Sequence, residues 1–329
     1  MLTKVLIIRF SSIGDIVLCT SFLRQLKHQW KGDLEIHFLT KQKFSGVLNH
    51  NPNVSEIHTF EKSIAECYPT LVNQAFDYIF DLQSNLRSAL VKRRLKVLSF
   101  SLDKRNFAKY IWVRWGIKGS IGHVVDRYRQ TASAFNIQED GVGLEFYLAP
   151  GDHFKVEVNH FIAVVLGATH AGKRADAQHW IDWLTDVKLP IILLGGESEV
   201  TLAKEISERI ACLNLSGELE LGQSASVIKQ AKMVITGDTG LMHIAAAFKK
   251  DIISLWGCTR PSLGMAPWLP GENSVVLEPI NRKSVPCSKL GNRCKYGWKK
   301  KCMHQLIKTQ IAQAIEAIDF AQQKALSTQ

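Results

Sequence analysis

The sequence predicts an α/β protein of two domains, each with a parallel sheet covered by helices on both faces. Three observations lead to this fold class. The 329 residues exceed the roughly 250 to 300 residues at which a single hydrophobic core stops growing. Strand-like and helix-like segments alternate through the first half, and continuous apolar runs ending in glycine recur through the second.

The first half of the chain alternates between two kinds of periodicity. Short apolar runs predict strands at residues 5–8, 34–39, 78–82 and 96–100. Apolar residues at helical spacing predict helices at residues 17–29 and 63–74. This order of elements favours a parallel sheet with helices on its faces.

The second half contains apolar runs typical of fully buried parallel strands. They are "HFIAVVLGA" (160–168), "LPIILLGG" (189–196), "KMVITGD" (232–238) and "DIISLWG" (251–257). Pro150 and Gly151 interrupt both patterns. We therefore expect domains at residues 1–155 and 156–329, with the last helix a candidate to pack back on the first domain.

The charge of the chain points to anionic partners. The formal net charge is +11, and the excess concentrates between Arg87 and Arg129, where basic and aromatic residues are interleaved. A solvated face, a nucleic-acid groove and a surface for anionic lipid headgroups are all compatible with this segment.

The expected location is the cytoplasm. The first strand begins almost at the N-terminus, which leaves no room for a secretory leader. No run of about 18 apolar residues is present. The seven cysteines, an odd number in a long chain, fit a reducing compartment better than a disulfide framework.

The stretch "RFSSIGDIVLC" places Asp15 in the turn between the first strand and the first helix. Such turns lie at the carboxyl ends of the strands, where open α/β sheets bind ligands. A carboxylate at this position is a candidate functional group. The alternative is that Ser11, Ser12 or Asp15 only caps the helix.

The stretch "TGDTGLMHIAAAF" (236–248) forms a second turn from strand to helix. Its backbone N–H groups and the helix dipole would make an anion site suited to phosphate. Thr239 adds a hydroxyl donor and Gly240 allows close approach. The alternative is a helix cap by Asp238, with His243 only packed or solvated.

These two stretches, with "DLQSNLRSAL", "HVVDRYRQ" and "LWGCTRPSLGMAPW", resemble glycosyltransferase family 9, the heptosyltransferase-type enzymes. The resemblance extends over nearly the whole chain. It implies a GT-B fold, in which two Rossmann-like domains with parallel sheets face a central cleft. It also implies an inverting transfer of heptose from ADP-heptose to the lipid A-linked inner core of lipopolysaccharide.

Two alternatives to this function stay open. A relative within the family could use another nucleotide sugar or another acceptor. From a different class, the chain could be a non-catalytic module that binds anionic lipid or nucleic acid. A dehydrogenase is excluded because no G-x-G-x-x-G follows a predicted strand.

The resemblance also implies roles for particular residues. Asp15 would be the base that accepts the proton of the acceptor hydroxyl. The acceptor-binding positions are Ser12, Gly14, Arg87 and Arg127. The donor-binding positions are Lys173, Arg174, Glu199, Asp238, Thr239, Gly240, Leu241 and His243.

The expected partners are the nucleotide-sugar donor and an anionic glycolipid at the inner face of the cytoplasmic membrane, where the protein would be peripheral; no nucleic acid is expected. We expect no required cofactor or catalytic metal besides the ADP-sugar, because the sequence has no D-x-D motif. A weaker alternative is a metal site made of Cys287, Cys294, Cys302 and His304, whose spacing lacks the tight C-x2-C pair of common zinc sites.

Overall fold

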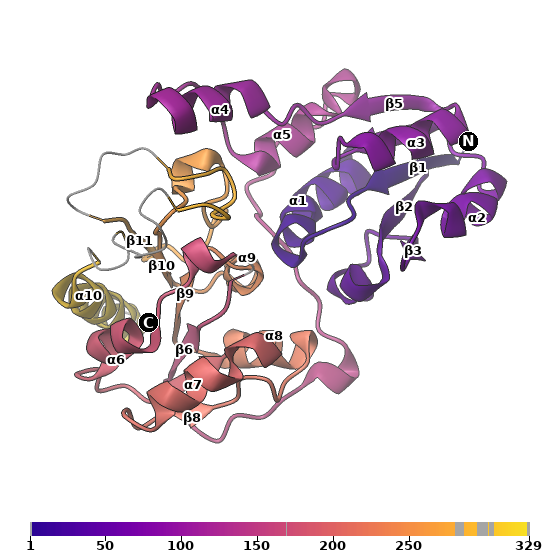
Figure 1. Ribbon diagram of the computed structural model, residues 1–329. Coiled ribbons are helices and arrows are strands. Elements are labelled where there is room, and N and C mark those ends of the chain that lie inside the picture. The colour runs from indigo at the N-terminus through magenta and orange to yellow at the C-terminus, as the bar shows by residue number, and fades with distance from the viewer. Residues whose placement is uncertain (1, 169, 280–285, 295–301, 303–305, 328–329) are drawn as a thin grey trace. The chain divides into compact units, whose positions relative to one another are not determined.

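The computed structural model describes the whole chain except residues 1, 169, 280–285, 295–301, 303–305 and 328–329 (Figure 1). The chain divides into two compact units. The first unit comprises Met1–Asn106 and Gly122–Tyr147, and the second comprises Phe107–Ile121 and Leu148–Gln329.

The first unit contains a five-stranded parallel sheet in the order β3-β2-β1-β4-β5. Its strands are β1 (Thr3–Ile8), β2 (Leu34–Lys41), β3 (Glu56–Phe60), β4 (Tyr78–Asp81) and β5 (Leu98–Ser101). Its helices are α1 (Ile13–Gln29), α2 (Tyr68–Asn73), α3 (Leu86–Leu95) and α5 (Val124–Gln130), with short 3-10 helices at Gln42–Val47, Ile64–Cys67 and Ser133–Phe135.

Alternate side chains of the central strand β1 point to opposite faces of this sheet. Helix α1 packs against α5, and α2 packs against α3. Leu6 and Ile8 share a buried cluster with Leu71 of α2 and Val91 of α3. Since successive strand side chains point to opposite faces, the intervening Val5 and Ile7, also fully buried, face the other side.

The second unit contains a six-stranded parallel sheet in the order β11-β10-β9-β6-β7-β8. Its strands are β6 (Ile162–Val165), β7 (Ile191–Leu194), β8 (Leu213–Asn214), β9 (Met233–Gly237), β10 (Ile252–Leu255) and β11 (Val275–Leu277). Its helices are α4 (Asn106–Trp115), α6 (Ala177–Leu184), α7 (Val200–Ser207), α8 (Leu221–Gln230), α9 (Gly240–Ala247) and α10 (Lys308–Ser327), with 3-10 helices at Pro150–Asp152, Ala171–Lys173, Glu197–Glu199 and Pro261–Leu263.

The expected strands are all present, and three further strands occur at sheet edges: β3, β8 and β11. The helix expected at residues 63–74 is divided between Ile64–Cys67 and α2. Pro69 lies in the first turn of α2, where its missing N–H is tolerated, but it could not continue a preceding helix. The strand expected from residue 96 begins at Leu98, because Lys96 adopts a left-handed conformation that ends α3.

The boundary between the units differs from the expected one at residues 155 and 156. The chain passes to the second unit at Leu148, and the earlier segment Phe107–Ile121 also belongs there. Trp112 of α4 is buried against Ile121 and Leu263. This contact joins α4 to the second unit although its neighbours in sequence belong to the first.

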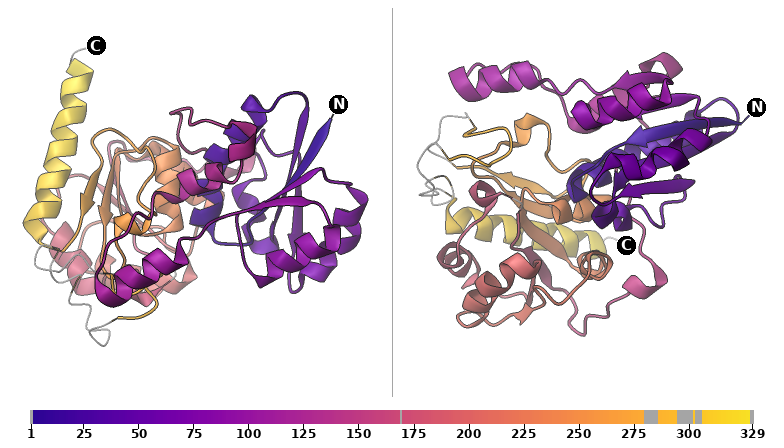
Figure 2. Two further views of the ribbon diagram at one scale, coloured as in Figure 1. Left: turned by 90° about the horizontal axis from the view of Figure 1, so that it is seen from above. Right: turned by 45° about the vertical axis from the view of Figure 1, so that its right-hand side comes forward.

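The last helix, α10, contacts α6, β10 and β11 (Figure 2). Its apolar residues Ile311, Ile315 and Ile318 are buried in the main core cluster of the second unit. The buried face of α10 therefore packs against the core of the second unit.

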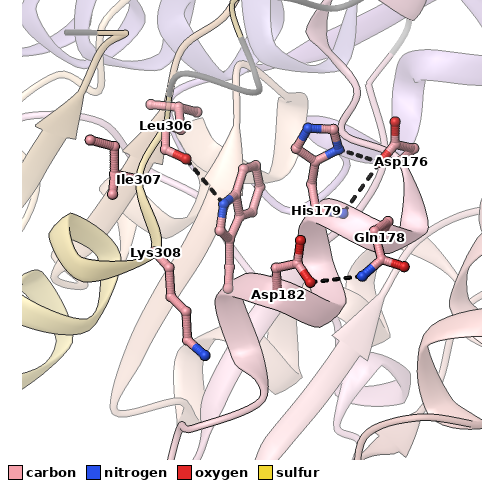
Figure 3. Close-up of a pocket in the computed structure, with 8 residues that line it drawn as sticks. Asp176, Gln178, His179, Asp182, Leu306, Ile307 and Lys308 are labelled. Carbon is pink, nitrogen blue, oxygen red and sulfur yellow. Dashed lines mark hydrogen bonds and ion pairs between the residues drawn. The ribbon is translucent and has the colours of Figure 1, made fainter.

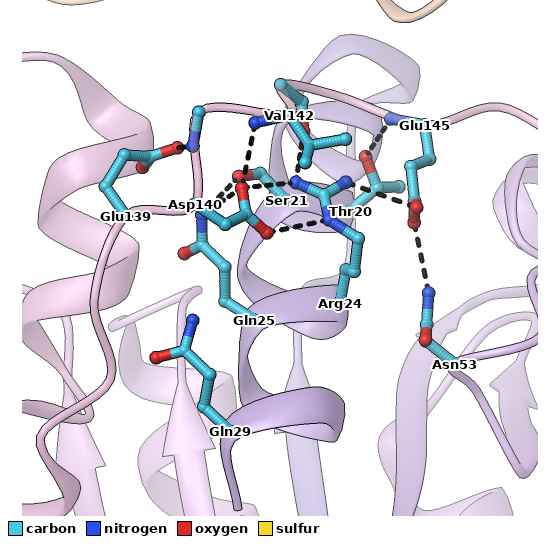
Figure 4. Close-up of polar contacts among 12 residues, drawn as sticks. Thr20, Ser21, Arg24, Gln25, Gln29, Asn53, Glu139, Asp140, Val142 and Glu145 are labelled. Carbon is cyan, nitrogen blue, oxygen red and sulfur yellow. Dashed lines mark hydrogen bonds and ion pairs between the residues drawn. The ribbon is translucent and has the colours of Figure 1, made fainter.

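One buried arginine fixes the end of the first unit to α1 (Figure 4). The Arg24 guanidinium donates two hydrogen bonds to the Asp140 carboxylate, both of 2.9 Å, and a third to the Gly143 carbonyl. It also lies 3.2 Å from a carboxylate oxygen of Glu145. The bidentate geometry holds the segment after α5 in one position.

We expect Arg24→Ala to lower the free energy of unfolding of the first unit by about 2 to 4 kcal/mol, because it leaves partly buried carboxylates without their cation. Urea unfolding followed by circular dichroism measures the loss. Lys31→Ala, at an exposed position beyond α1, is the control and should change little. Equal stability of the two variants would contradict this role for Arg24.

Candidate functional site

Each sheet has a point at which the strand order reverses. In the first unit the chain runs from β1 to β2 and β3 on one side and to β4 and β5 on the other. In the second unit the reversal lies between β6 and β9. The loops that follow the two strands on either side of this point run in opposite directions. The crevice between these loops is where α/β sheets bind ligands.

The first-unit site is built on the turn after β1. A carboxylate oxygen of Asp15 lies 2.7 Å from the Arg9 guanidinium. The other oxygen accepts hydrogen bonds from the Ser12 N–H and the Ser12 hydroxyl, both at 3.1 Å. Ser12 is the N-cap of α1 and Gly14 is buried in its first turn. Asp15 thus supports the helix start, as the capping alternative expects, and 21% of its side chain stays exposed.

Electrostatics keep the Asp15 carboxylate ionised. Burial alone would raise the pKa of Asp15, but the charge of Arg9 and the hydrogen bonds from Ser12 lower it below its ordinary value. Arg9 is itself held in place, since it donates to the Leu82 carbonyl at 2.7 Å and to the Ser11 carbonyl at 2.9 Å.

A second cation of the first unit, Arg127 of α5, is buried and forms no ion pair with a carboxylate of the described residues. Only 4% of it is exposed, and burial lowers its pKa. It donates to the Asp103 carbonyl at 3.3 Å. Its Nε and Nη2 find no acceptor within the described part of the chain. Such donors are suited to an anionic ligand, because an unmet buried donor is costly.

Lys104 belongs to the same electrostatic environment. Burial and the charge of Arg9 lower its pKa, while Asp81 and Asp15 oppose the shift. Arg87 is different, because it is exposed in the first turn of α3, and the contacts of the described residues do not join it to Asp15 or Arg127.

The second-unit site is built on the loops after β6 and β9. The Lys173 ammonium lies 2.5 Å from a carboxylate oxygen of Asp238, which also accepts a hydrogen bond from the Thr259 hydroxyl at 3.2 Å. Thr239 is the N-cap of α9 and accepts from the Met242 N–H at 3.1 Å. Lys173 therefore lies at the turn that begins α9.

The start of α9 is accessible. Thr239, Gly240 and Leu241 are half-exposed, whereas His243 is buried. The first N–H groups of a helix have no acceptor within the helix, and together with the helix dipole they favour an anion.

Arg174 and Glu199 join the loops after β6 and β7. Arg174 donates to the Ala168 carbonyl at 2.6 Å and lies 3.5 Å from the Glu199 carboxylate. Glu199 also accepts from the Gly196 N–H at 3.0 Å and from the Ser198 hydroxyl at 2.6 Å. Of the two basic residues expected here, Lys173 is the one placed beside Asp238, and Glu199 is engaged by its own loops.

The predicted cysteine group gains a member that sequence reasoning missed. The Sγ atoms of Cys287 and Cys294 lie within 4.8 Å of each other and of Cys258. Cys302 lies 3.9 Å from Cys258, measured between sulfurs, and His304 is outside the described residues.

A surface hollow of about 420 Å³ lies between α6 and the start of α10 (Figure 3). Its polar groups are engaged with one another: Asp176 caps α6 and pairs with His179, and the Trp183 indole donates to the Leu306 carbonyl at 3.3 Å. These contacts between the lining residues hold the helix ends together, so we assign the hollow a structural role.

Sequence reasoning also missed Arg9, Lys104 and Thr259. The position of Arg9 could have been predicted as part of the site, because a charged residue directly after a buried strand needs a partner of opposite charge at the sheet edge. Thr259 and Lys104 lie in irregular segments and had no such signal.

Two parallel, doubly wound units, each with a polar site at the reversal of strand order, define the GT-B class of glycosyltransferases. The chain belongs to glycosyltransferase family 9 (heptosyltransferase), whose family model matches residues 65–317, and it is an enzyme of that class. The alternative of a non-catalytic module is therefore wrong.

Individual relatives agree with this assignment. Lipopolysaccharide heptosyltransferase 1 of Campylobacter coli is 31% identical over 295 residues, which cover 78% of this chain and 84% of that protein. Among solved structures, Escherichia coli ADP-heptose LPS heptosyltransferase II has a TM-score of 0.72 at 20% identity, over 98% of this chain and 100% of its own. The E. coli heptosyltransferase WaaC with ADP has a TM-score of 0.68 at 21% identity, over 96% and 100%. No helix among the described residues is long and apolar enough to cross a membrane.

The lowered pKa of Asp15 predicts how stability depends on pH. A carboxyl whose pKa is lower in the folded state stabilises that state above its unfolded pKa of about 3.9, and this contribution is lost as the pH falls through the folded value. The difference in unfolding free energy between the wild type and Asp15→Asn should therefore be constant from pH 7 to about pH 5 and should shrink below about pH 4. Urea titrations at several pH values measure it. A difference that already narrows between pH 7 and pH 5 would show that the pKa is raised instead.

Proposed function

We propose that this enzyme transfers heptose from ADP-heptose, with inversion, to the lipid A-linked inner core of lipopolysaccharide. The observation that carries the proposal is the ionised Asp15 carboxylate, partly exposed where the strand order of the first unit reverses. The named activities of the relatives support the sugar and the acceptor.

In the proposed reaction the acceptor hydroxyl attacks the anomeric carbon of the donor. A new carbon–oxygen bond forms, the bond to the diphosphate breaks, and ADP leaves with the bonding electrons. An inverting displacement needs a base on the side opposite the leaving group. Asp15 accepts the proton: its two oxygens offer about four lone-pair sites, and Arg9 and Ser12 engage only part of them.

The second unit is proposed to bind the donor diphosphate. The accessible N–H groups at the start of α9 and the Thr239 hydroxyl offer donors to phosphate oxygens. Lys173 supplies a full positive charge, oriented by Asp238. Fixed donors of this kind stabilise the charge that develops on a leaving diphosphate, so the proposal requires no catalytic metal.

The acceptor is proposed to be an anionic glycolipid. Arg127 has two buried donors with no acceptor in the described part of the chain, and Lys104 adds a charge that acts on Arg9 and Asp15. A carboxylate or phosphate of the acceptor would satisfy these donors. Ser12 and Gly14 lie in the turn that would receive the reacting hydroxyl, and the exposed Arg87 is available to a larger acceptor.

Helix α4 is proposed to hold the enzyme on an anionic membrane surface. Phe107, Tyr110 and Trp115 are exposed large side chains on or at the end of this short helix. Lys109 and Arg114 lie among them. Aromatic rings are favoured at the membrane interface, and each nearby Lys or Arg contributes about 1 kcal/mol toward an anionic surface.

The test of the reaction is transfer from ADP-heptose to a heptose-free lipopolysaccharide acceptor. We expect Asp15→Asn to lower turnover by about 10²- to 10⁴-fold, since asparagine cannot accept the proton. The affinity for ADP should be nearly unchanged. Because the substitution also removes the partner of Arg9, turnover is compared per folded molecule. Asp33→Asn, at an exposed position, is the control. Near wild-type turnover in Asp15→Asn would overturn the base assignment, and transfer only from another nucleotide sugar would overturn the donor.

The test of the membrane surface is binding to vesicles of zwitterionic lipid with and without anionic lipid. We expect the combined change Lys109→Glu, Arg114→Glu and Trp115→Ser to weaken binding to anionic vesicles by at least tenfold, and more strongly at low salt. Reversal of Arg93 and Arg94, exposed on α3, is the matched control for charge. Equal losses in both variants would mean that net charge, and not α4, determines binding.

A further inference from the structure

Four cysteines of the second unit meet beside the end of β10, although they are far apart in sequence. Cys258 follows β10, and Cys287, Cys294 and Cys302 belong to the segment between β11 and α10. Cys258, Cys287 and Cys302 are buried, at 1%, 5% and 1% exposure. Cys294 packs against the same core cluster.

The spacing of three of the sulfurs suits a tetrahedral metal ion, and Cys302 lies beside one of them as the candidate fourth ligand. The Sγ atoms of Cys258, Cys287 and Cys294 lie within 4.8 Å of one another, and those of Cys258 and Cys302 are 3.9 Å apart. Metal–sulfur bonds of about 2.3 Å in a tetrahedron place neighbouring sulfurs about 3.8 Å apart. A disulfide would require about 2.05 Å.

The charge of the surrounding sequence also suits such an ion. Four thiolates around a divalent cation leave a net charge of −2. Residues 279–302 contain no Asp or Glu, and their eight basic residues are Arg282, Lys283, Lys289, Arg293, Lys295, Lys299, Lys300 and Lys301. The segment that supplies three of the ligands therefore carries an excess of compensating positive charge.

From this geometry we propose that Cys258, Cys287, Cys294 and Cys302 bind one thiophilic metal ion, Zn²⁺ or mononuclear iron. Tetrahedral sites of four sulfurs select these metals. Four protein ligands leave no open position, which makes the site structural and not catalytic.

The site has a structural consequence for the loop that carries Lys173. The Cys258 N–H donates to the Gly172 carbonyl at 3.4 Å, and the Gly172 N–H donates to the Gly291 carbonyl at 3.2 Å. A Cβ on Gly172 would lie 3.0 Å from the Cys258 sulfur, and a Cβ on Gly291 would lie 2.9 Å from Lys173 Cγ. The metal thus holds the cysteine segment against the Lys173 loop; its effect on ADP binding rests on the proposed function.

The first measurement is the metal content of the full-length protein, purified under reducing conditions without chelators. We expect close to one equivalent of zinc or iron per chain, and iron alone would give visible absorption. After replacement by Co²⁺, intense sulfur-to-cobalt absorption should report thiolate ligation. A wild-type protein that holds no metal, and takes up neither Zn²⁺ nor Fe²⁺ while its thiols remain reduced, would overturn the site.

Variants test which residues are ligands. Cys287→Ser and Cys294→Ser should lose at least half of the bound metal and the full cobalt spectrum, whereas Cys212→Ser, a half-buried cysteine outside the cluster, should retain both. Metal retained in full by both ligand variants would overturn the assignment. If those variants fail to fold, the cobalt spectrum of the wild type decides.

The positioning effect is measured on wild-type protein before and after metal removal. We expect removal to lower the melting temperature and to weaken ADP binding by about tenfold, with recovery when the metal is returned. Unchanged ADP affinity in metal-free, folded protein would overturn the positioning role. Metal content does not depend on transfer activity, so failure of the proposed function is distinguishable from failure of the metal site.

Discussion

The reversal of strand order within each parallel sheet is the constraint on which both sites depend. All strands of a parallel sheet end at the same edge, and where neighbouring strands send their chains in opposite directions the edge opens. Asp15 and Arg9 follow β1 at the reversal of the first sheet, and Lys173 and Asp238 follow β6 and β9 at the reversal of the second. The polar residues are displayed by strands that are themselves almost wholly apolar and buried.

Buried cations account for much of the polar organisation of the first unit. Arg9 and Arg24 each bind carboxylates, and each joins α1 or its preceding turn to a distant part of the chain. A buried charge is tolerated only where it is paired and hydrogen-bonded. Arg127 departs from this rule in the described structure, which is why we propose that an anionic group of the acceptor pairs with it.

In the second unit, the proposed cysteine site would order a segment that lacks regular secondary structure. Residues 286–294 form neither helix nor strand, yet they lie against the loop that presents Lys173. A segment without a hydrogen-bonded ladder has little to oppose its conformational entropy. Metal ligation couples binding energy directly to the folding of such a segment, and it would do so beside the residue proposed to face the donor phosphates.

The sequence by itself determined the central strands of both sheets and the two turns that hold the candidate site residues. Apolar runs marked the central strands, and the residues after them marked Asp15 and Asp238, because both signals are local and repeat at short spacing. Tertiary structure decided the partners. In the folded chain Arg9 pairs with Asp15, and Glu199 bonds to the loops after β6 and β7. Trp112 packs α4 into the second unit. Tertiary structure also brought Cys258 to cysteines about 30 and more residues away. Such pairings depend on the order of strands in the sheet and on the packing of loops at its edge. No periodicity along the chain encodes that geometry.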